Sequence, residues 1–243
     1  MPHSWNGGRR FSDRMAAVLA MIASGDAAAP DPEVARASAL ALGVTGIGVR
    51  VATGPIADGT DGGGEPVWFS GPLLAALDHL ELTLGEGPGI DAAAGSVALA
   101  ADLATESRWP MFGAAACELG VRASFAFPLG IGAIHVGVLV AYRTTPGPLT
   151  DQQLIDAWVF ADAITLVLLN ASALDPPTAP RWVLGSAGLE RARIHQATGM
   201  ISVQLAVSLA EALVRLRAYA FSSERPIDDV AADVVAGRLR FDT

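Results

Sequence analysis

The sequence predicts an α+β domain followed by a small all-helical bundle, and three observations indicate this. Residues 122–143 alternate apolar and other side chains at the period of a β-strand, around a glycine-rich turn. The long segment 150–170 has the apolar content of a buried helix. Residues 186–243 contain only helical patterns, and a proline-containing linker, 172–185, precedes them. We therefore expect an antiparallel sheet flanked by helices, and then three short helices.

The first domain is expected to occupy residues 14–171, after a disordered lead at 1–13. Helices are predicted at 14–25, 33–42, 72–80, 109–119 and 150–170. Strands are predicted at 45–51, 67–70, 97–102 and in two arms of 122–143, joined across residues 130–132. A Gly/Asp-rich loop is predicted at 54–66. Because Ile47, Val49 and Val51 share one strand face, we expect them on one side of the sheet.

Composition limits the function classes. A chain of 243 residues that is 51% hydrophobic can bury a core and is not a largely disordered protein. The net charge is −9, all sixteen basic residues are arginine, and residues 189–243 carry seven arginines against seven acids. Any nucleic-acid contact must therefore depend on locally placed arginines. The single cysteine, Cys117, excludes an intramolecular disulfide and fits a reducing compartment.

One apolar segment is long enough to suggest a membrane span. Residues 123–142 carry no charge over twenty positions. Pro128 and three glycines interrupt this segment, and its alternation favours two strands. At the N-terminus, the apolar run after Arg14 is short and has the spacing of an amphipathic helix, which argues against an export signal. We expect a cytoplasmic protein without a membrane segment.

Catalytic and metal-binding patterns are weak. Glu86 and Asp91 flank a Gly-Pro-Gly turn and are a candidate acid–base pair, but a turn with a structural role explains them better. The triple glycine at 62–64 lacks the frame and the lysine of a phosphate-binding loop. The four histidines are scattered, so we expect no metal site, no catalytic residue and no resident cofactor.

The C-terminal region has a recognisable arrangement of three helical segments. They read ARIHQATGMI (192–201), EALVRLRAYA (211–220) and PIDDVAADVV (226–235), and Ser208 with Glu211 forms a capping box before the second. This region resembles the ANTAR domain, an RNA-binding three-helix module of bacterial transcription antiterminators. The chain departs from the family's usual Ala-Lys-Gly at Ala197-Thr198-Gly199, and from its usual glycine at Ala206-Val207.

The resemblance implies that RNA hairpins are the partners of this region. The candidate RNA-binding residues are Arg191, Arg193, His195, Thr198, Arg217 and Arg225. Arginine planes can contact phosphates or stack on unpaired bases, and a threonine hydroxyl can donate a hydrogen bond. The alternative for each arginine is a solvated helix face paired with nearby acids.

Residues 72–170 resemble a second family. The segments TLGEGPGIDAAAGSVALAADL (83–103), RWPMF (108–112), GVRASFAFPLGIGAIHVGVLVAYR (120–143) and PGPLTDQQLIDA (146–157) resemble the GAF domain that is fused to ANTAR in many actinobacterial regulators. Many of these relatives have cysteine where this chain has Gly89. GAF domains are sensors of small molecules and dimerisation platforms, so the resemblance implies an unidentified ligand. The candidate ligand-binding residues are Trp68, Glu86, Phe125, Phe127 and His135.

Together, these features predict a GAF sensor that controls an ANTAR output domain in transcription antitermination. The long helices 14–25 and 150–170 are expected to pair with those of a second subunit in a homodimer. Two alternatives remain. The tail could dock protein instead of RNA, and, as the last option, the chain could be a small-molecule enzyme. The interior of the sheet could hold a small apolar ligand or be filled by Trp68, Phe125 and Phe127.

Overall fold

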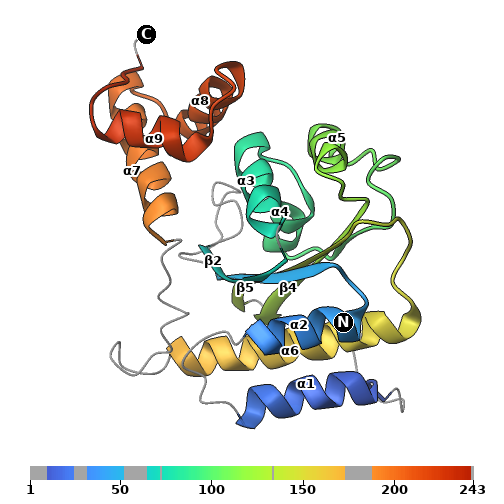
Figure 1. Ribbon diagram of the computed structural model, residues 1–243. Helices are drawn as coiled ribbons and strands as arrows, with labels where there is room; N and C mark the ends of the chain where they lie inside the picture. The colour runs from blue at the N-terminus through green and yellow to red at the C-terminus, as the bar shows by residue number, and fades with distance from the viewer. Residues whose placement is uncertain are drawn as a thin grey trace.

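The computed structural model describes residues 10–24, 32–51, 65–71, 73–132, 134–172 and 188–241. Figure 1 shows a sheet with helices above and below it, and a separate cluster of helices at the C-terminal end. The strands are β1 (Gly46–Val51), β2 (Glu65–Ser70), β3 (Ala98–Ala100), β4 (Ala123–Ile131) and β5 (Ile134–Arg143). The helices of the first domain are α1 (Asp13–Ser24), α2 (Pro32–Leu42), α3 (Leu74–Leu84), α4 (Pro88–Ala93), α5 (Pro110–Glu118) and α6 (Asp151–Ser172).

The sheet has the strand order β2-β1-β5-β4-β3, and each neighbouring pair is antiparallel. The predicted hairpin is confirmed, although its turn is displaced from the expected residues 130–132. A register shift follows Leu129, pairing then continues to Ile131 opposite Ile134, and Gly132 adopts φ 61° in the turn. The turn is displaced because β4 continues through Gly130 and Ile131, so two of the three expected turn residues are paired with β5.

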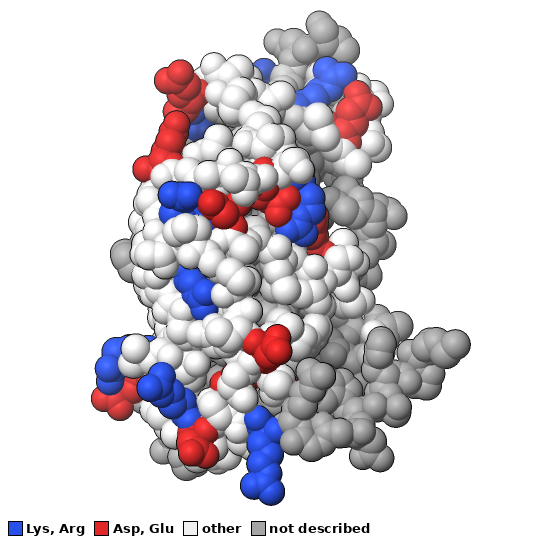
Figure 2. Space-filling model, turned by 90° about the vertical axis from the view of Figure 1, so that its right-hand side faces the viewer, with Lys and Arg blue, Asp and Glu red and all other residues white. Residues whose placement is uncertain are grey.

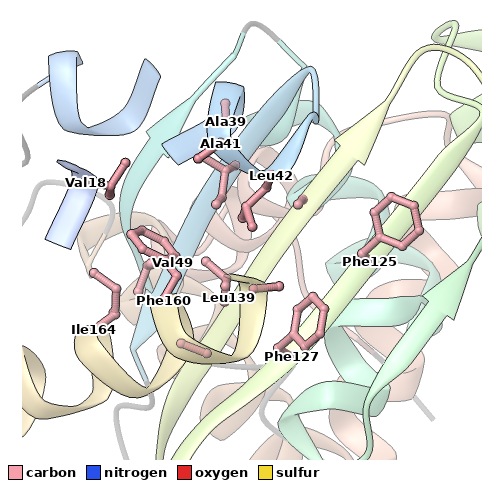
Figure 3. Close-up of a cluster of buried hydrophobic side chains, with 14 of the residues drawn as sticks. Val18, Ala39, Ala41, Leu42, Val49, Phe125, Phe127, Leu139, Phe160 and Ile164 are labelled. Atoms are coloured by element: carbon pink, nitrogen blue, oxygen red, sulfur yellow. The ribbon is translucent and has the colours of Figure 1, made fainter. Parts of the chain in front are cut away.

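Helices α2 and α6 cover one face of the sheet and α1 packs on these two helices (Figure 1); Phe125, Phe127 and Leu139 contribute to the buried apolar cluster on this side (Figure 3). Ile47 and Val49 enter the same cluster, and the half-buried Val51 packs against it, as the alternation of β1 predicts. The two expected long helices, α1 and α6, lie on this face. Helix α6 buries apolar side chains against the sheet, and α1 buries Met15 and Val18 in the same cluster where it packs on α2 and α6, so the inner faces of both helices are already occupied.

Helices α3, α4 and α5 cover the opposite face of the sheet. Their buried residues surround Trp109, Phe112 and Tyr142, which form a second apolar cluster. The sequence patterns did not predict α4, because it has only six residues and contains Gly89. Helix α3 runs to Leu84 and so extends beyond the predicted end at residue 80. The sheet therefore separates two cores, and α3 forms part of the outer layer.

Helix α6 is long and apolar enough to cross a bilayer by length and composition, and 44% of its most apolar window is buried inside the protein. Phe160, Ile164 and Leu168 of this helix pack in the cluster under the sheet. Its apolar character is accounted for by this packing, as in the core helix of a domain. The other uncharged segment, 123–142, forms the β4–β5 hairpin, as predicted.

The C-terminal bundle consists of α7 (Gly188–Leu205), α8 (Leu209–Ser222) and α9 (Ile227–Val235). The axes of residues 193–205 and 209–222 are inclined by 106°, and α9 packs against both helices. The predicted apolar residues of α7 and α8 are buried in one shared cluster: Ile194, Ala197, Ile201, Leu205, Ala212, Leu213, Leu216 and Ala220. The predicted three-helix bundle is therefore confirmed.

Two local features fix the connection between α7 and α8. The Ser208 hydroxyl accepts a hydrogen bond from the Glu211 amide at 3.2 Å and caps α8, as predicted. Ala206 ends α7 with φ 55°, in the left-handed region that favours glycine. The family's usual glycine in this connection thus corresponds to a real backbone requirement, which this chain meets with a strained alanine.

Three predicted segments fall largely or wholly outside the described residues: the lead at 1–13, the loop at 54–66 and the linker at 172–185. The domain boundaries that depend on them stay predictions.

Candidate functional site

The α+β domain contains a buried ion-pair cluster between β1 and α3. Arg50 is 1% exposed, and its two terminal nitrogens lie 2.9 Å from Asp78 Oδ1 and 2.7 Å from Glu81 Oε2. The strand alternation that sends Val49 into one core directs Arg50 to the opposite face. Asp78 and Glu81 lie three residues apart, so one face of α3 presents both carboxylates to Arg50.

Gly89, at the start of α4, completes this cluster. Its amide donates to Glu81 Oε1 at 2.6 Å. A Cβ atom at position 89 would overlap Arg50 Nη2 and Glu81 Oε2. The space that a side chain would need at position 89 is therefore occupied by the guanidinium of Arg50. The neighbouring Gly87 adopts φ 145°, so the glycines of this turn serve backbone and packing geometry, as expected.

The cluster contains two carboxylates and one guanidinium in a place shielded from water. Burial raises the pKa of Glu81, while Arg50 and the Gly89 amide offset part of that shift. Burial acting alone would lower the pKa of Arg50, but the two carboxylates outweigh it and leave the pKa raised. The raised pKa of Glu81 and the raised pKa of Arg50 both fit a site in which two carboxylates share one guanidinium. The buried ion pairs join α3 to strand β1 of the sheet.

A small cavity of about 20 Å³ lies beside this cluster. It is lined by Arg50, Leu74, Leu77, Asp78, Glu81, Phe112, Ser124, Val140, Ala141 and Tyr142. This volume holds about one water molecule. A larger ligand could enter only if α3 moved or if the Arg50 ion pairs rearranged.

The predicted ligand-binding residues are not brought together at this cavity. Phe125 and Phe127 point into the core on the other face of the sheet (Figure 3), so the fully packed alternative holds for these two rings. His135 is exposed at the β4–β5 hairpin. The side chain of Trp68 lies outside what the structure describes. The sequence reasoning missed Arg50, although a lone arginine within an apolar strand was a usable signal.

Glu86 has a structural partner. Its Oε1 accepts hydrogen bonds from the amides of Met111 at 2.7 Å and Phe112 at 2.9 Å. These amides belong to the first turn of α5, where backbone N–H groups have no acceptor within the helix, and the N-cap residue of α5 supplies no side-chain acceptor either. Asp91 accepts a hydrogen bond from Trp109 Nε1 at 3.1 Å. The carboxylate pair considered as a candidate for acid–base chemistry is thus engaged in hydrogen bonds that hold α5 in the α+β domain.

The candidate RNA-binding residues lie in different surroundings. Arg193 and His195 are exposed on α7, whereas the side chain of Arg191 is outside the described part of that helix. Arg225 is bound to Asp233 Oδ2 at 2.7 Å, and the same aspartate pairs with Arg238 at 2.6 Å.

Thr198 lies elsewhere than expected: it is only 6% exposed, and its hydroxyl donates to the Ile194 carbonyl at 2.7 Å. It lies inside the bundle because it falls four residues after Ile194, on the face of α7 that packs in the shared core.

Arg217 turns toward α3 of the α+β domain. Its Nε donates to the Leu82 carbonyl at 2.9 Å, near the end of α3. Burial lowers the pKa of Arg217, which marks a guanidinium partly removed from water. Leu82 itself packs in the apolar cluster of the bundle, and His79 Nδ1 lies 3.7 Å from Asp228 Oδ1. The bundle therefore rests on α3 (Figure 1).

Charges of both signs are interspersed on the face shown in Figure 2, with arginines beside acidic side chains and no broad basic area. Three ion pairs place an arginine next to an acidic side chain in this way: Arg108 with Glu106, Arg122 with Asp102, and Arg215 with Glu211. Among the residues that the structure describes, no group of three or more His, Cys, Asp or Glu side chains is placed to hold a metal ion.

Comparison with known proteins agrees with this two-part architecture. Residues 184–235 match the family model of the ANTAR domain. The crystal structure of the GAF domain from an Acinetobacter phosphoenolpyruvate-protein phosphotransferase superposes with a TM-score of 0.51, at 12% identity, over 66% of this chain and 94% of that one. No curated protein matches the chain.

Two further structures are similar at lower scores. One is a free methionine-R-sulfoxide reductase from Neisseria meningitidis, with a TM-score of 0.47 at 17% identity over 65% of this chain and 92% of that one. The other is a phosphotransferase GAF domain from Coxiella burnetii, with a TM-score of 0.45 at 17% identity over 67% and 98%. The fold assignment depends on the Acinetobacter structure, whose score is higher. The chain thus joins a GAF-type fold to an ANTAR domain.

Proposed function

We propose that the protein is a signal-responsive RNA-binding regulator of transcription antitermination, in which the GAF-type domain controls the ANTAR output domain. The observation that supports this most directly is the ANTAR match at residues 184–235, which covers all three helices α7–α9. RNA hairpins are the proposed partners. Binding of paired hairpins would prevent a terminator from forming and allow transcription to continue.

The exposed part of α7 is the proposed first contact with RNA. Arg193 and His195 are exposed there, and Arg191 lies one helical turn before His195. Guanidinium groups can bind phosphates or stack on the unpaired bases of a hairpin loop. Because the bundle region has no excess of positive charge, we expect modest affinity that depends on a few arginines.

The remaining parts of the proposal concern the sensor. A small ligand is expected in the GAF-type domain, in a cytoplasmic homodimer of actinobacterial type. The proposed boundaries are 14–171 for the sensor, 172–185 for the linker and 186–243 for the RNA-binding domain. The exposed side chain of Leu166 on α6, with 55% of its surface accessible, is compatible with helix pairing between subunits.

The direct test is to crosslink the full-length protein to RNA in its native host and to sequence the RNA that co-purifies. Enrichment of hairpins near terminators is the expected result. In vitro, binding of an enriched hairpin should weaken steeply as salt is raised, and Arg193→Ala should reduce both the affinity and the salt dependence. Recovery of no specific RNA, together with no hairpin binding at low salt, would contradict the proposal.

A second function is favoured by one specific observation. The bundle docks on α3 through Leu82 and Arg217, so its surface is able to bind protein. The tail could therefore serve as a protein-docking module instead of an RNA reader. A bundle of that kind would not bind hairpin RNA even at low salt.

A further inference from the structure

Helix α3 has contacts of two kinds on different sides. On one side, Asp78 and Glu81 hold the buried Arg50 next to the small cavity. On the other side, His79 and Leu82 contact the C-terminal bundle. A movement of α3 that changes one set of contacts must therefore act on the other, since a helix moves largely as a rigid element.

The contact with the bundle has both an apolar and a polar component. Leu82 is 8% exposed, and the residues that cover it belong to the bundle. The Leu82 carbonyl is one of the last four of α3, which have no partner within the helix. Arg217 donates to this carbonyl at 2.9 Å, so a cation occupies the negative end of the α3 dipole.

Gly85 permits the close approach of Arg217. It ends α3 with φ 71°, and a Cβ atom there would lie 3.0 Å from Arg217 Nη1. The turn after α3 thus leaves room for the guanidinium to lie against it. Arg217 is held by shape as well as by its hydrogen bond.

We propose that docking of the bundle on α3 is an intramolecular brake, in which Arg217 is held by the sensor and withheld from RNA. This inference rests on the proposed function. The Nε–H group that donates to Leu82 cannot donate to a phosphate at the same time. RNA binding and docking on α3 therefore compete for one side chain, and each must weaken the other to the same extent.

The cavity supplies a route for the signal. It holds about one water molecule, so a larger ligand must displace α3 or separate Arg50 from its carboxylates. Displacement of α3 would move the Leu82 carbonyl that holds Arg217. A ligand that favours this displaced arrangement would release the bundle in proportion to its preference.

The test uses the full-length protein and the substitution Leu82→Gln, which weakens docking without adding charge. Leu82 packs with the bundle and not with the core of the sensor, so the sensor should stay folded. Leu40→Gln is the matched control, because Leu40 is a 60% exposed leucine on α2. Hydrogen exchange of residues 79–85 and 213–220 reports docking, and fluorescence anisotropy with a labelled hairpin reports RNA binding.

We expect Leu82→Gln to lose exchange protection at both segments and to bind the hairpin about fivefold more tightly or better than the wild type. Arg217→Ala added to Leu82→Gln should remove that gain. Leu40→Gln should behave as the wild type. Saturating RNA should also reduce protection of residues 79–85 in the wild type, because docking and binding are reciprocal.

The two ways of failing are distinguishable. If the wild type and Leu82→Gln bind RNA equally well, the brake is overturned and the proposed function stands. Unchanged exchange protection in Leu82→Gln would also overturn the brake and leave the proposed function standing. If neither the wild type nor Leu82→Gln binds hairpin RNA at low salt, the proposed function fails, and the brake on RNA binding fails with it.

Discussion

Gly89 and Arg50 occupy one shared space: a Cβ atom on Gly89 would overlap the Arg50 guanidinium. The buried ion pairs of Arg50 with Asp78 and Glu81 therefore require glycine at position 89. In this chain, a cysteine at position 89 would have to displace a buried cation, so Gly89 is part of the ion-pair site.

Gly89→Ala should destabilise the sensor by about 3 kcal/mol, because it expels Arg50 and leaves two carboxylates buried without their cation. In an Arg50→Met background, the same substitution should cost about 2 kcal/mol less. Denaturant unfolding of the four proteins measures this coupling. Gly199→Ala is the control: a Cβ atom there meets nothing within 4 Å, and we expect a gain of about 0.5–1 kcal/mol from helix propensity. Equal effects of Gly89→Ala in both backgrounds would show that the space is not shared.

Glu86→Ala should lower the free energy of unfolding by about 1–2 kcal/mol, since the Met111 and Phe112 amides lose their acceptor. Glu86→Gln keeps one carbonyl acceptor and should retain much of this stability. Glu118→Ala, an exposed acid at the far end of α5, should have little effect. If Glu86 has only a ligand-binding role, Glu86→Ala will unfold at the same denaturant concentration as the wild type.

Ala206→Gly should stabilise the C-terminal bundle by about 0.5–1 kcal/mol. The left-handed conformation of Ala206, with φ 55°, disfavours any side chain. Removal of the Cβ atom relieves this cost, and the gain exceeds the extra conformational entropy that glycine loses on folding. Ala218→Gly is the matched control, because Ala218 is exposed within α8 and should become less stable by about 1 kcal/mol. Thermal unfolding followed by circular dichroism measures both. A loss of stability in Ala206→Gly would mean that the turn is relaxed in solution.

Periodicity was sufficient for the elements with strong patterns. The alternation in β1 predicted that Ile47, Val49 and Val51 share one face of the sheet, and the spacing in α7 and α8 predicted the bundle core. Helix α4 escaped prediction because six residues cannot show a helical period. Periodicity has a general limit: a local pattern shows that a side chain is buried, but it does not show which residue from elsewhere in the chain packs against it.

The candidate sites were harder to predict for the same reason. Thr198 and Arg217 were both expected on a polar RNA-binding surface, yet Thr198 is buried and Arg217 contacts α3. The partner of Arg217 is a backbone carbonyl 135 residues away in sequence, which no local pattern encodes. The Arg50 cluster likewise joins a strand to a helix 28 residues later. The charges themselves were visible, whereas their pairing required the tertiary fold.

Asp233→Asn should strengthen RNA binding. Asp233 accepts hydrogen bonds from Arg225 and Arg238, and these two arginines, led by their hydrogen bonds, hold its pKa below the usual range. The aspartate therefore remains charged at any pH near neutrality and neutralises both neighbours. Its removal should free two guanidinium groups for phosphate contacts, raise the affinity several-fold at low salt and steepen the salt dependence by about one to two charges. The control is Glu118→Gln on α5, which changes the net charge of the chain by the same amount and should leave RNA binding unchanged. An equal response of the two variants would show that only the net charge of the chain matters. If neither variant alters hairpin binding in a salt titration, Arg225 and Arg238 do not belong to the RNA-binding surface.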